Sequence, residues 1–352
     1  MLEAPEFWWH RRHIAGWALA PLGMVYGAVT GARMGRTGQT AELPVICVGN
    51  FVLGGAGKTP VAMAVAAACR RIGRKPAFLT RGYGGSERGP LLVQEKNQTA
   101  RQVGDEALLL ARIAPTVVSA DRMAGARLIA EMGNNIIIMD DGFQNPSVHK
   151  DLSLVVVDGG AGVGNGWTFP AGPLRAPLAA QLRAADAVIR LGEGEPGQAV
   201  VRRAARAAVP VLTAEYQPVR KRGFKTRKFL AFAGIGRPQK FYDTLEKNGV
   251  SVELTADFPD HHPYTEEDCR TLVDLAESRD LVPVTTEKDW VRIRNLGPAA
   301  ERLLEIAEQF PVIVRFGEEG RLRWVSAPPA CSCQFSLATE YSIAVGPRRS
   351  SP

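Results

Sequence analysis

The chain has 352 residues, of which 45% are hydrophobic and 22% are charged, and its five cysteines form no CxxC pair. The length is typical of about two domains, and the composition excludes a mostly disordered or collagen-like chain, a secreted disulfide framework and a zinc module. The net charge of +7 lies almost entirely in residues 202–228, which hold nine Lys or Arg and one Glu. The positive charge of this segment indicates either a binding site for an anionic partner or simply a solvent-exposed surface. Nucleic acid is not favoured, because no aromatic-rich recognition module accompanies the charge.

The first predicted element is an apolar helix over residues 14–32, which carry no charge across 19 positions between Arg12 and Arg33. At 1.5 Å per residue this run would reach about 28 Å, slightly less than a hydrocarbon core of about 30 Å. Gly23, Gly27 and Gly31 recur at a spacing of four, as in helices that pack within membranes. A membrane span, a helix lying in the membrane interface and a core helix of a soluble domain therefore remain open. We favour the interfacial helix with basic flanks.

A glycine-rich loop follows a short apolar strand, residues 43–48, and precedes an Ala-rich helix, residues 61–71. This order of strand, glycine loop, Lys-Thr and helix is the context of a phosphate-binding loop. Lys58 would bridge the β and γ phosphates of a nucleotide, and Thr59 would offer its hydroxyl to Mg²⁺. The strict motif has a glycine where this chain has Val52. The predicted nucleotide-binding residues are Gly54, Gly55, Ala56, Gly57, Lys58 and Thr59.

A second apolar strand, residues 135–139, ends in Asp140 and Asp141. This pattern is typical of the Walker B site, where an aspartate holds the Mg²⁺ shell; a buried strand with an aspartate turn is the alternative. Further strands alternate with helices at 104–113 and 121–132. The sequence therefore predicts an α/β fold, a P-loop NTPase-like, mostly parallel sheet with helices on both faces. The additional predicted strands are 76–80, 116–119, 152–157, 187–191 and 209–214.

Seven strings stand together in one order along residues 49–289. They are the glycine-rich loop at 49–60, Thr-Arg-Gly-Tyr-Gly-Gly at 80–85, Val-Gly-Asp-Glu at 103–106, Asp-Asp-Gly-Phe-Gln at 140–144, Pro-Ala-Gly-Pro-Leu-Arg at 170–175, Phe-Pro-Asp-His-His-Pro-Tyr at 258–264 and Thr-Glu-Lys-Asp at 286–289. With these strings the chain resembles the tetraacyldisaccharide 4'-kinase family, the lipid A 4'-kinases. The family usually has Glu after Pro-Leu-Arg, where this chain has Ala176.

The resemblance implies that ATP, with Mg²⁺, phosphorylates the 4'-hydroxyl of a tetraacylated glucosamine disaccharide 1-phosphate in lipid A biosynthesis. It further implies action at the cytoplasmic face of the inner membrane, with the membrane surface and the lipid disaccharide as partners, and we expect a monomer. The family combines a P-loop kinase domain with a smaller C-terminal α/β domain. We therefore expect a membrane-associated helical segment (1–36), a P-loop kinase domain (37–215), a basic linker (216–228), a C-terminal α/β domain (229–326) and a loosely ordered tail (327–352).

The resemblance also points to an Asp105–His261 pair, which with Lys58 forms the predicted catalytic set. A carboxylate beside an imidazole can orient the ring and raise its basicity, and histidine titrates near neutral pH. Asp105 could alternatively cap the helix that follows it. Thr286 is expected to cap another helix, with Asp289 completing a capping box. The residues expected to bind the acceptor are Arg81, Tyr83, Arg122, Gln144 and Arg175; the residues expected to bind the metal are Thr59, Asp140 and Asp141.

A competing function is a membrane-associated P-loop nucleotide switch without a lipid acceptor. Guanine-specific switches carry an Asn-Lys-x-Asp string, and the nearest string here, residues 286–289, has Glu where Asn should stand. Nucleotide preference and a lipid phosphorylation assay would separate these functions.

Overall fold

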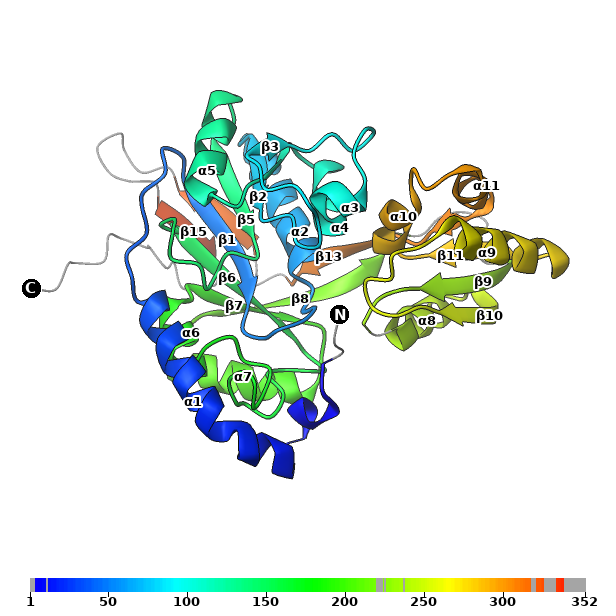
Figure 1. Cartoon of the computed structure of the whole chain (residues 1–352). Coiled ribbons are helices and arrows are strands. Elements are labelled where there is room, and N and C mark those ends of the chain that lie inside the picture. The colour runs from blue at the N-terminus through cyan, green and yellow to red at the C-terminus, as the bar shows by residue number, and fades with distance from the viewer. Residues whose placement is uncertain are drawn as a thin grey trace, which may run out of the picture.

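The computed structural model describes residues 4–10, 12–219, 224, 226–236 and 238–317, together with the strands at 321–325 and 334–338. The larger of two units is built on a nine-stranded sheet in the order β13-β8-β7-β6-β1-β5-β2-β4-β3 (Figure 1). Seven central strands are parallel, and the edge strands β3 and β13 are antiparallel to their neighbours. The strands are β1 (Val45–Asn50), β2 (Pro76–Thr80), β3 (Leu91–Leu92), β4 (Thr116–Val118), β5 (Ile136–Asp140), β6 (Leu152–Asp158), β7 (Ala187–Leu191), β8 (Val211–Pro218) and β13 (Val312–Phe316).

Helices cover both faces of this sheet, so its central strands are buried on both sides and read as continuous apolar runs. Alternate residues of β1 enter opposite core layers: Cys47 packs in one, whereas Ile46 and Val48 pack in the other. The helices of this unit are α2 (Lys58–Arg71), α3 (Ala100–Val103), α4 (Asp105–Ala111), α5 (Arg122–Glu131), α6 (Leu178–Ala184) and α7 (Glu195–Arg206).

A second, smaller α/β unit lies beside the first, at the right of Figure 1. Its four parallel strands run in the order β10-β9-β11-β12 around a separate core that includes Leu230, Phe232 and Tyr264. The predicted fold class, a P-loop NTPase-like sheet with a second α/β domain, is thereby confirmed. The elements are β9 (Lys228–Ala233), α8 (Pro238–Lys247), β10 (Ser251–Asp257), α9 (Glu266–Ser278), β11 (Val282–Thr285), α10 (Glu287–Ile293), α11 (Pro298–Ile306) and β12 (Glu308–Gln309).

The boundary between the units differs from the expected one in two places. Strand β8 continues to Pro218, and β13 pairs with it from Val312 to Phe316, so 312–316 belong to the first sheet and not to the C-terminal domain. Apolar alternation predicts a strand but does not identify its partner. In the predicted tail, 334–338 form β15, which pairs antiparallel with β14 at 321–325; the other residues after 326 lie outside the described residues.

Helix α1 (Ile14–Met34) follows a 3-10 turn, η1 (Glu6–Trp9), and lies on the first unit beside α6 (Figure 1). It is a surface helix, because only 22% of its most apolar 18-residue window is buried, so the core-helix alternative is wrong. Gly23 and Gly27 face Thr168 of the same chain, and a Cβ on Gly23 would lie 2.8 Å from the Thr168 carbonyl oxygen. The glycine spacing therefore serves packing within the chain. The large apolar side chains that face outward are Ile14, Trp17, Leu22, Met24, Val25 and Val29.

Candidate active site

The glycine-rich loop leads from β1 into the N-terminus of α2. Gly57 has a left-handed φ of 80°, and a Cβ there would lie 2.4 Å from a methyl group of Leu191, so only glycine fits. A Cβ at Gly54 or Gly55 would meet no atom within 4 Å, so this part of the loop borders open space. The loop therefore leaves room for a ligand directly before α2, where free N–H groups and the helix dipole favour an anion such as phosphate.

Lys58 and Thr59 begin α2 opposite the two aspartates at the end of β5, because β5 lies next to β1 in the sheet. The Thr59 hydroxyl donates to Asp140 Oδ2 at 3.2 Å, and Lys58 Nζ lies 3.7 Å from Asp141 Oδ2. Burial and the nearby Glu106 charge raise the pKa of Asp140 to about 7. Burial would raise the pKa of Asp141 as well, but the charges of Lys58 and a neighbouring arginine hold it below its usual value.

The same residues fit a magnesium ion. Asp140 is fully buried, and its Oδ1 has no hydrogen-bond partner among the described residues. This orphaned oxygen, together with the Thr59 hydroxyl and the Asp141 carboxylate, offers the hard oxygen donors that Mg²⁺ prefers. Within the described ranges no group of three or more His, Cys, Asp or Glu could hold a metal alone. Such sparse protein ligation is typical of Mg²⁺ that is bound together with substrate phosphates.

Asp105 and His261 meet across the boundary between the two units, 3.3 Å apart between Oδ2 and Nδ1. Asp105 is the first residue of α4 in the first unit, and His261 follows β10 in the second. The N-cap of α4 is Gly104, so the alternative that Asp105 caps this helix is wrong. Burial would raise the pKa of Asp105, but its hydrogen bond with His261 and the charges of Arg292 and Lys288 hold that pKa far below its usual value.

Helix α10 supplies the residues that surround this pair. Thr286 accepts a hydrogen bond from the Asp289 N–H at 3.1 Å, which confirms the expected cap. Lys288 Nζ donates to Glu106 at 3.0 Å, and the Arg292 guanidinium contacts both Asp105 and His261. The sequence-based site omitted Glu106, Lys288, Asp289 and Arg292. Three of them stood in strings that the resemblance singled out, whereas Arg292 stood in none.

Arg175 lies inside the predicted site, and its side chain forms hydrogen bonds with other residues of the site. Its guanidinium donates to both oxygens of Asp141, at 2.8 and 3.2 Å, and its Nε donates to the Val52 carbonyl at 2.9 Å. In this arrangement it fixes the second aspartate against the glycine-rich loop. Ala176, the residue after Arg175, is fully buried.

Gln144 also bonds to the chain rather than facing open space. Its amide donates to the Asn50 carbonyl at 2.7 Å and to the side chain of Gln181 at 2.9 Å. Gln181 is itself completely buried and donates to the Phe51 and Ala176 carbonyls. These bonds support the strand end from which the glycine-rich loop departs.

The other residues expected to bind the acceptor differ in exposure. Arg81 is exposed, and Tyr83 is 54% exposed with its ring 6.2 Å from the His261 ring. Arg122 is buried and donates to the Ser119 carbonyl, while its Nε has no partner among the described residues. Of Arg81, Tyr83 and Arg122, it is Tyr83 whose side chain lies beside the Asp105–His261 pair.

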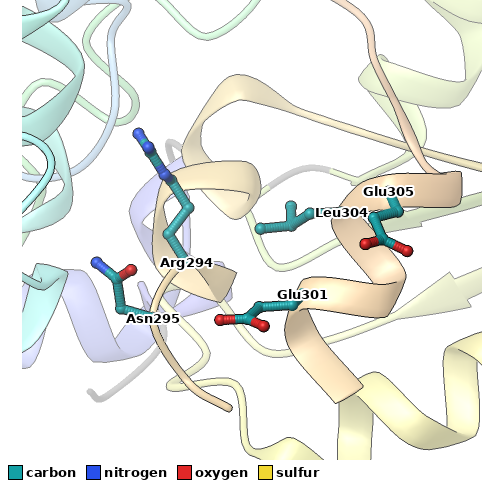
Figure 2. A pocket seen from close by; sticks show the side chains of 5 residues that line it. All are labelled: Arg294, Asn295, Glu301, Leu304 and Glu305. Carbon is teal, nitrogen blue, oxygen red and sulfur yellow. The ribbon is translucent and has the colours of Figure 1, made fainter. Parts of the chain in front are cut away.

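A separate open pocket lies in the second unit, where the end of α10 faces α11 (Figure 2). None of the residues predicted for the site lines it. The lining residues are Arg294, Asn295, Glu301, Leu304 and Glu305.

The fold, the glycine-rich loop and the paired aspartates define a P-loop kinase fold, and a second α/β unit meets the first at the Asp105–His261 contact. A model of the family described as tetraacyldisaccharide-1-P 4'-kinase matches residues 15–326, so the chain belongs to that family.

Curated relatives agree with this assignment. A protein of Methylorubrum extorquens (strain PA1) named tetraacyldisaccharide 4'-kinase is 50% identical, over 92% of this chain and 97% of its own length. A protein of the same name from Methylobacterium radiotolerans is 51% identical, over 88% and 95% of the two chains. Another from Bradyrhizobium sp. (strain ORS 278) is 47% identical, over 92% and 96%.

Among solved structures, a crystal structure of LpxK from Aquifex aeolicus in complex with ATP superimposes with a TM-score of 0.69. The match covers 87% of this chain and 96% of the other at 24% identity, and it shows a shared fold.

Proposed function

We infer that this protein is an ATP-dependent kinase that transfers the γ-phosphoryl group to the 4'-hydroxyl of a tetraacylated glucosamine disaccharide 1-phosphate in lipid A biosynthesis. The observation that carries this function is the membership of the chain in the tetraacyldisaccharide-1-P 4'-kinase family over residues 15–326. The nucleotide switch is disfavoured for two reasons. All three relatives are named tetraacyldisaccharide 4'-kinase, and the sequence has no Asn-Lys-x-Asp string.

On the donor side, the glycine-rich loop and the N-terminus of α2 would surround the phosphates of ATP. Lys58 would neutralise charge between the β and γ phosphates, and it is held in place by Asp141 at 3.7 Å. Thr59, Asp140 and Asp141 would hold Mg²⁺. When bound, this ion supplies charge neutralisation on the transferring phosphoryl group.

On the acceptor side, we propose that the Asp105–His261 pair takes the proton of the 4'-hydroxyl. With a proton on Nδ1, His261 donates to the Asp105 carboxylate, and Nε2 is left free to accept the hydroxyl proton. General-base assistance of this kind is worth about 10²–10⁴ in rate. We propose Arg81, Tyr83 and Arg122 as contacts of the acceptor, and Tyr83 has the best support because its ring lies beside His261.

We propose that the pair assembles when the second domain closes over the first. Its two members come from different domains, which are joined by the paired strands β8 and β13. Closure would exclude water from the γ-phosphate until the acceptor hydroxyl is in place, and so protect ATP from hydrolysis.

We propose that α1 lies in the inner membrane interface with the active site on the cytoplasmic side, where ATP is available. Its outward face is apolar, while its inward face packs on the kinase domain. Basic residues flank the helix on both sides and would meet anionic lipid. A single chain holds every proposed catalytic residue, which supports a monomer.

The experiment is a phosphorylation assay with the purified full chain, a tetraacylated disaccharide 1-phosphate in mixed micelles, Mg²⁺ and either ATP or GTP. We expect phosphate on the 4' position, with ATP strongly preferred. Nucleotide hydrolysis that proceeds equally with and without the lipid, and without a phosphorylated lipid product, would reject the kinase.

A further inference from the structure

Arg292 lies at the centre of the contact between the two domains, although no sequence motif includes it. Its side chain is 4% exposed, and its three nitrogens are all engaged. Nε donates to Asp105 Oδ2 at 2.8 Å, and one terminal nitrogen donates to the Gly234 carbonyl at 2.6 Å and to Asp289 Oδ1 at 3.0 Å. The other terminal nitrogen contacts Asp105 Oδ2 and lies 3.1 Å from His261 Nδ1.

The backbone at His261 is bound to the Gly234 carbonyl, which is also an acceptor for Arg292. His261 has a left-handed φ of 58°, which is uncommon for a residue with a side chain. Its N–H donates at 3.1 Å to the Gly234 carbonyl, which also accepts from Arg292. Arg292 therefore binds the loop that carries His261 as well as the carboxylate that His261 faces.

From this geometry we propose that Arg292 is a positioning residue for the reaction: it joins the loop of His261 in the second domain to Asp105 in the first, and it sets the hydrogen bonding of the pair. The inference rests on the proposed kinase function of that pair. A guanidinium only donates and a carboxylate only accepts. His261 Nδ1 can therefore either accept from Arg292 or donate to Asp105, but not both at once. Arg292 keeps Asp105 ionised, so that Nδ1 donates its proton to this carboxylate and Nε2 stays unprotonated, ready to accept the proton of the hydroxyl.

A lysine at position 292 could not form the same set of hydrogen bonds, because its ammonium group is a compact charge without the planar, multiple donors of a guanidinium. Loss of the positive charge, in contrast, removes one of the charges that hold the pKa of Asp105 low. The acidic limb of the pH–rate profile should therefore move to higher pH. The charged and titratable groups around the pair and Arg292 are Lys288 and Asp289 on α10, Glu106 on α4, and Asp260, Tyr83 and Tyr264 from the loops.

The test compares R292M, R292K and the control R294M in the full-length enzyme. Arg294 forms a different ion pair between the domains, with Glu95, and does not contact the catalytic pair. We expect R292M to lower kcat about a hundredfold, to change KM for ATP less than about threefold and to move the acidic limb up by about one pH unit. R292K should restore the position of the limb but still lose at least about tenfold in kcat, whereas R294M should change neither.

A second readout needs no turnover and separates this inference from the proposed function. In the protein with ¹⁵N-labelled histidine, R292M should shift the Nδ1 resonance of His261, and R294M should leave it in place. Wild-type kcat in R292K, an unmoved acidic limb in an R292M protein that binds ATP, or the same changes in R294M would overturn the proposal. If R292M does not fold, the kcat of R292K and its His261 resonance decide the question. If the wild-type enzyme phosphorylates no lipid, the proposed function fails while the histidine spectra still test the contact.

Discussion

Replacement of Asp140 by Asn should stabilise the ATP-free protein while it abolishes the reaction. The carboxyl is fully buried and its pKa is raised from 3.8 to about 7, mainly by burial and then by the charge of Glu106. The folded chain thus keeps a proton that the unfolded chain releases, and stability falls as the pH rises from about 4 to about 7. Above that window the ionised carboxylate costs on the order of 4 kcal/mol of folding free energy, at 1.36 kcal/mol per pKa unit.

The measurement is urea unfolding of wild type and D140N at pH 5 and pH 8, with EDTA present and nucleotide absent. An asparagine can still accept from the Thr59 hydroxyl, which now donates to Asp140 at 3.2 Å, so the variant tests the charge rather than the packing. The linkage relation predicts that the advantage of the variant is about 2–3 kcal/mol larger at pH 8 than at pH 5. An advantage that is the same at both pH values, or a variant less stable than wild type at pH 8, would refute this account of the buried aspartate.

Three further predictions address the other parts of the site. Lys58→Ala should lower kcat at least about a hundredfold in a protein with an unchanged circular dichroism spectrum, because a charge aimed at the transferring phosphate is lost; near-normal turnover would remove the P-loop assignment. Asp105→Ala, His261→Ala and the double variant should be about equally slow if the pair acts as a unit, whereas multiplicative losses in steady-state assays would indicate independent roles. Met24→Glu combined with Val25→Glu should weaken binding to anionic vesicles at least about tenfold in flotation assays, without change in detergent-micelle activity; unchanged flotation would place the anchor elsewhere.

The sequence was sufficient for the parts of the fold that are specified locally. The apolar run at 43–48, the glycine-rich loop and the start of α2 are consecutive, so spacing alone predicts where Lys58 and Thr59 lie. Asp140 and Asp141 could be added because parallel strands end at one edge of a sheet, and the structure places β5 next to β1. The fold class follows from the same alternation of strands and helices.

Contacts between distant parts of the chain could not be predicted in the same way. Strand β13 is separated from β8 by the whole second domain, and nothing in Val312–Phe316 specifies its partner. The contact of Asp105 with His261 followed only from the family resemblance. Arg292 was missed because a single arginine in a helix is ordinarily a surface charge, and only its burial among three acceptors reveals its role.

The charged contact between the two domains would suit the closure of one domain over the other that we propose. Arg292 and Lys288 are paired with Asp105, Asp289 and Glu106, so the buried cluster is nearly balanced in charge. Desolvation offsets much of the attraction in such a cluster, which makes it a weak source of stability but a strict determinant of geometry. An apolar contact of the same size would hold the domains together in any alignment that buries it. The ion pairs favour only the alignment in which Asp105 faces His261. They would also let the domains separate into water at modest cost, as the proposed entry and release of nucleotide and lipid require.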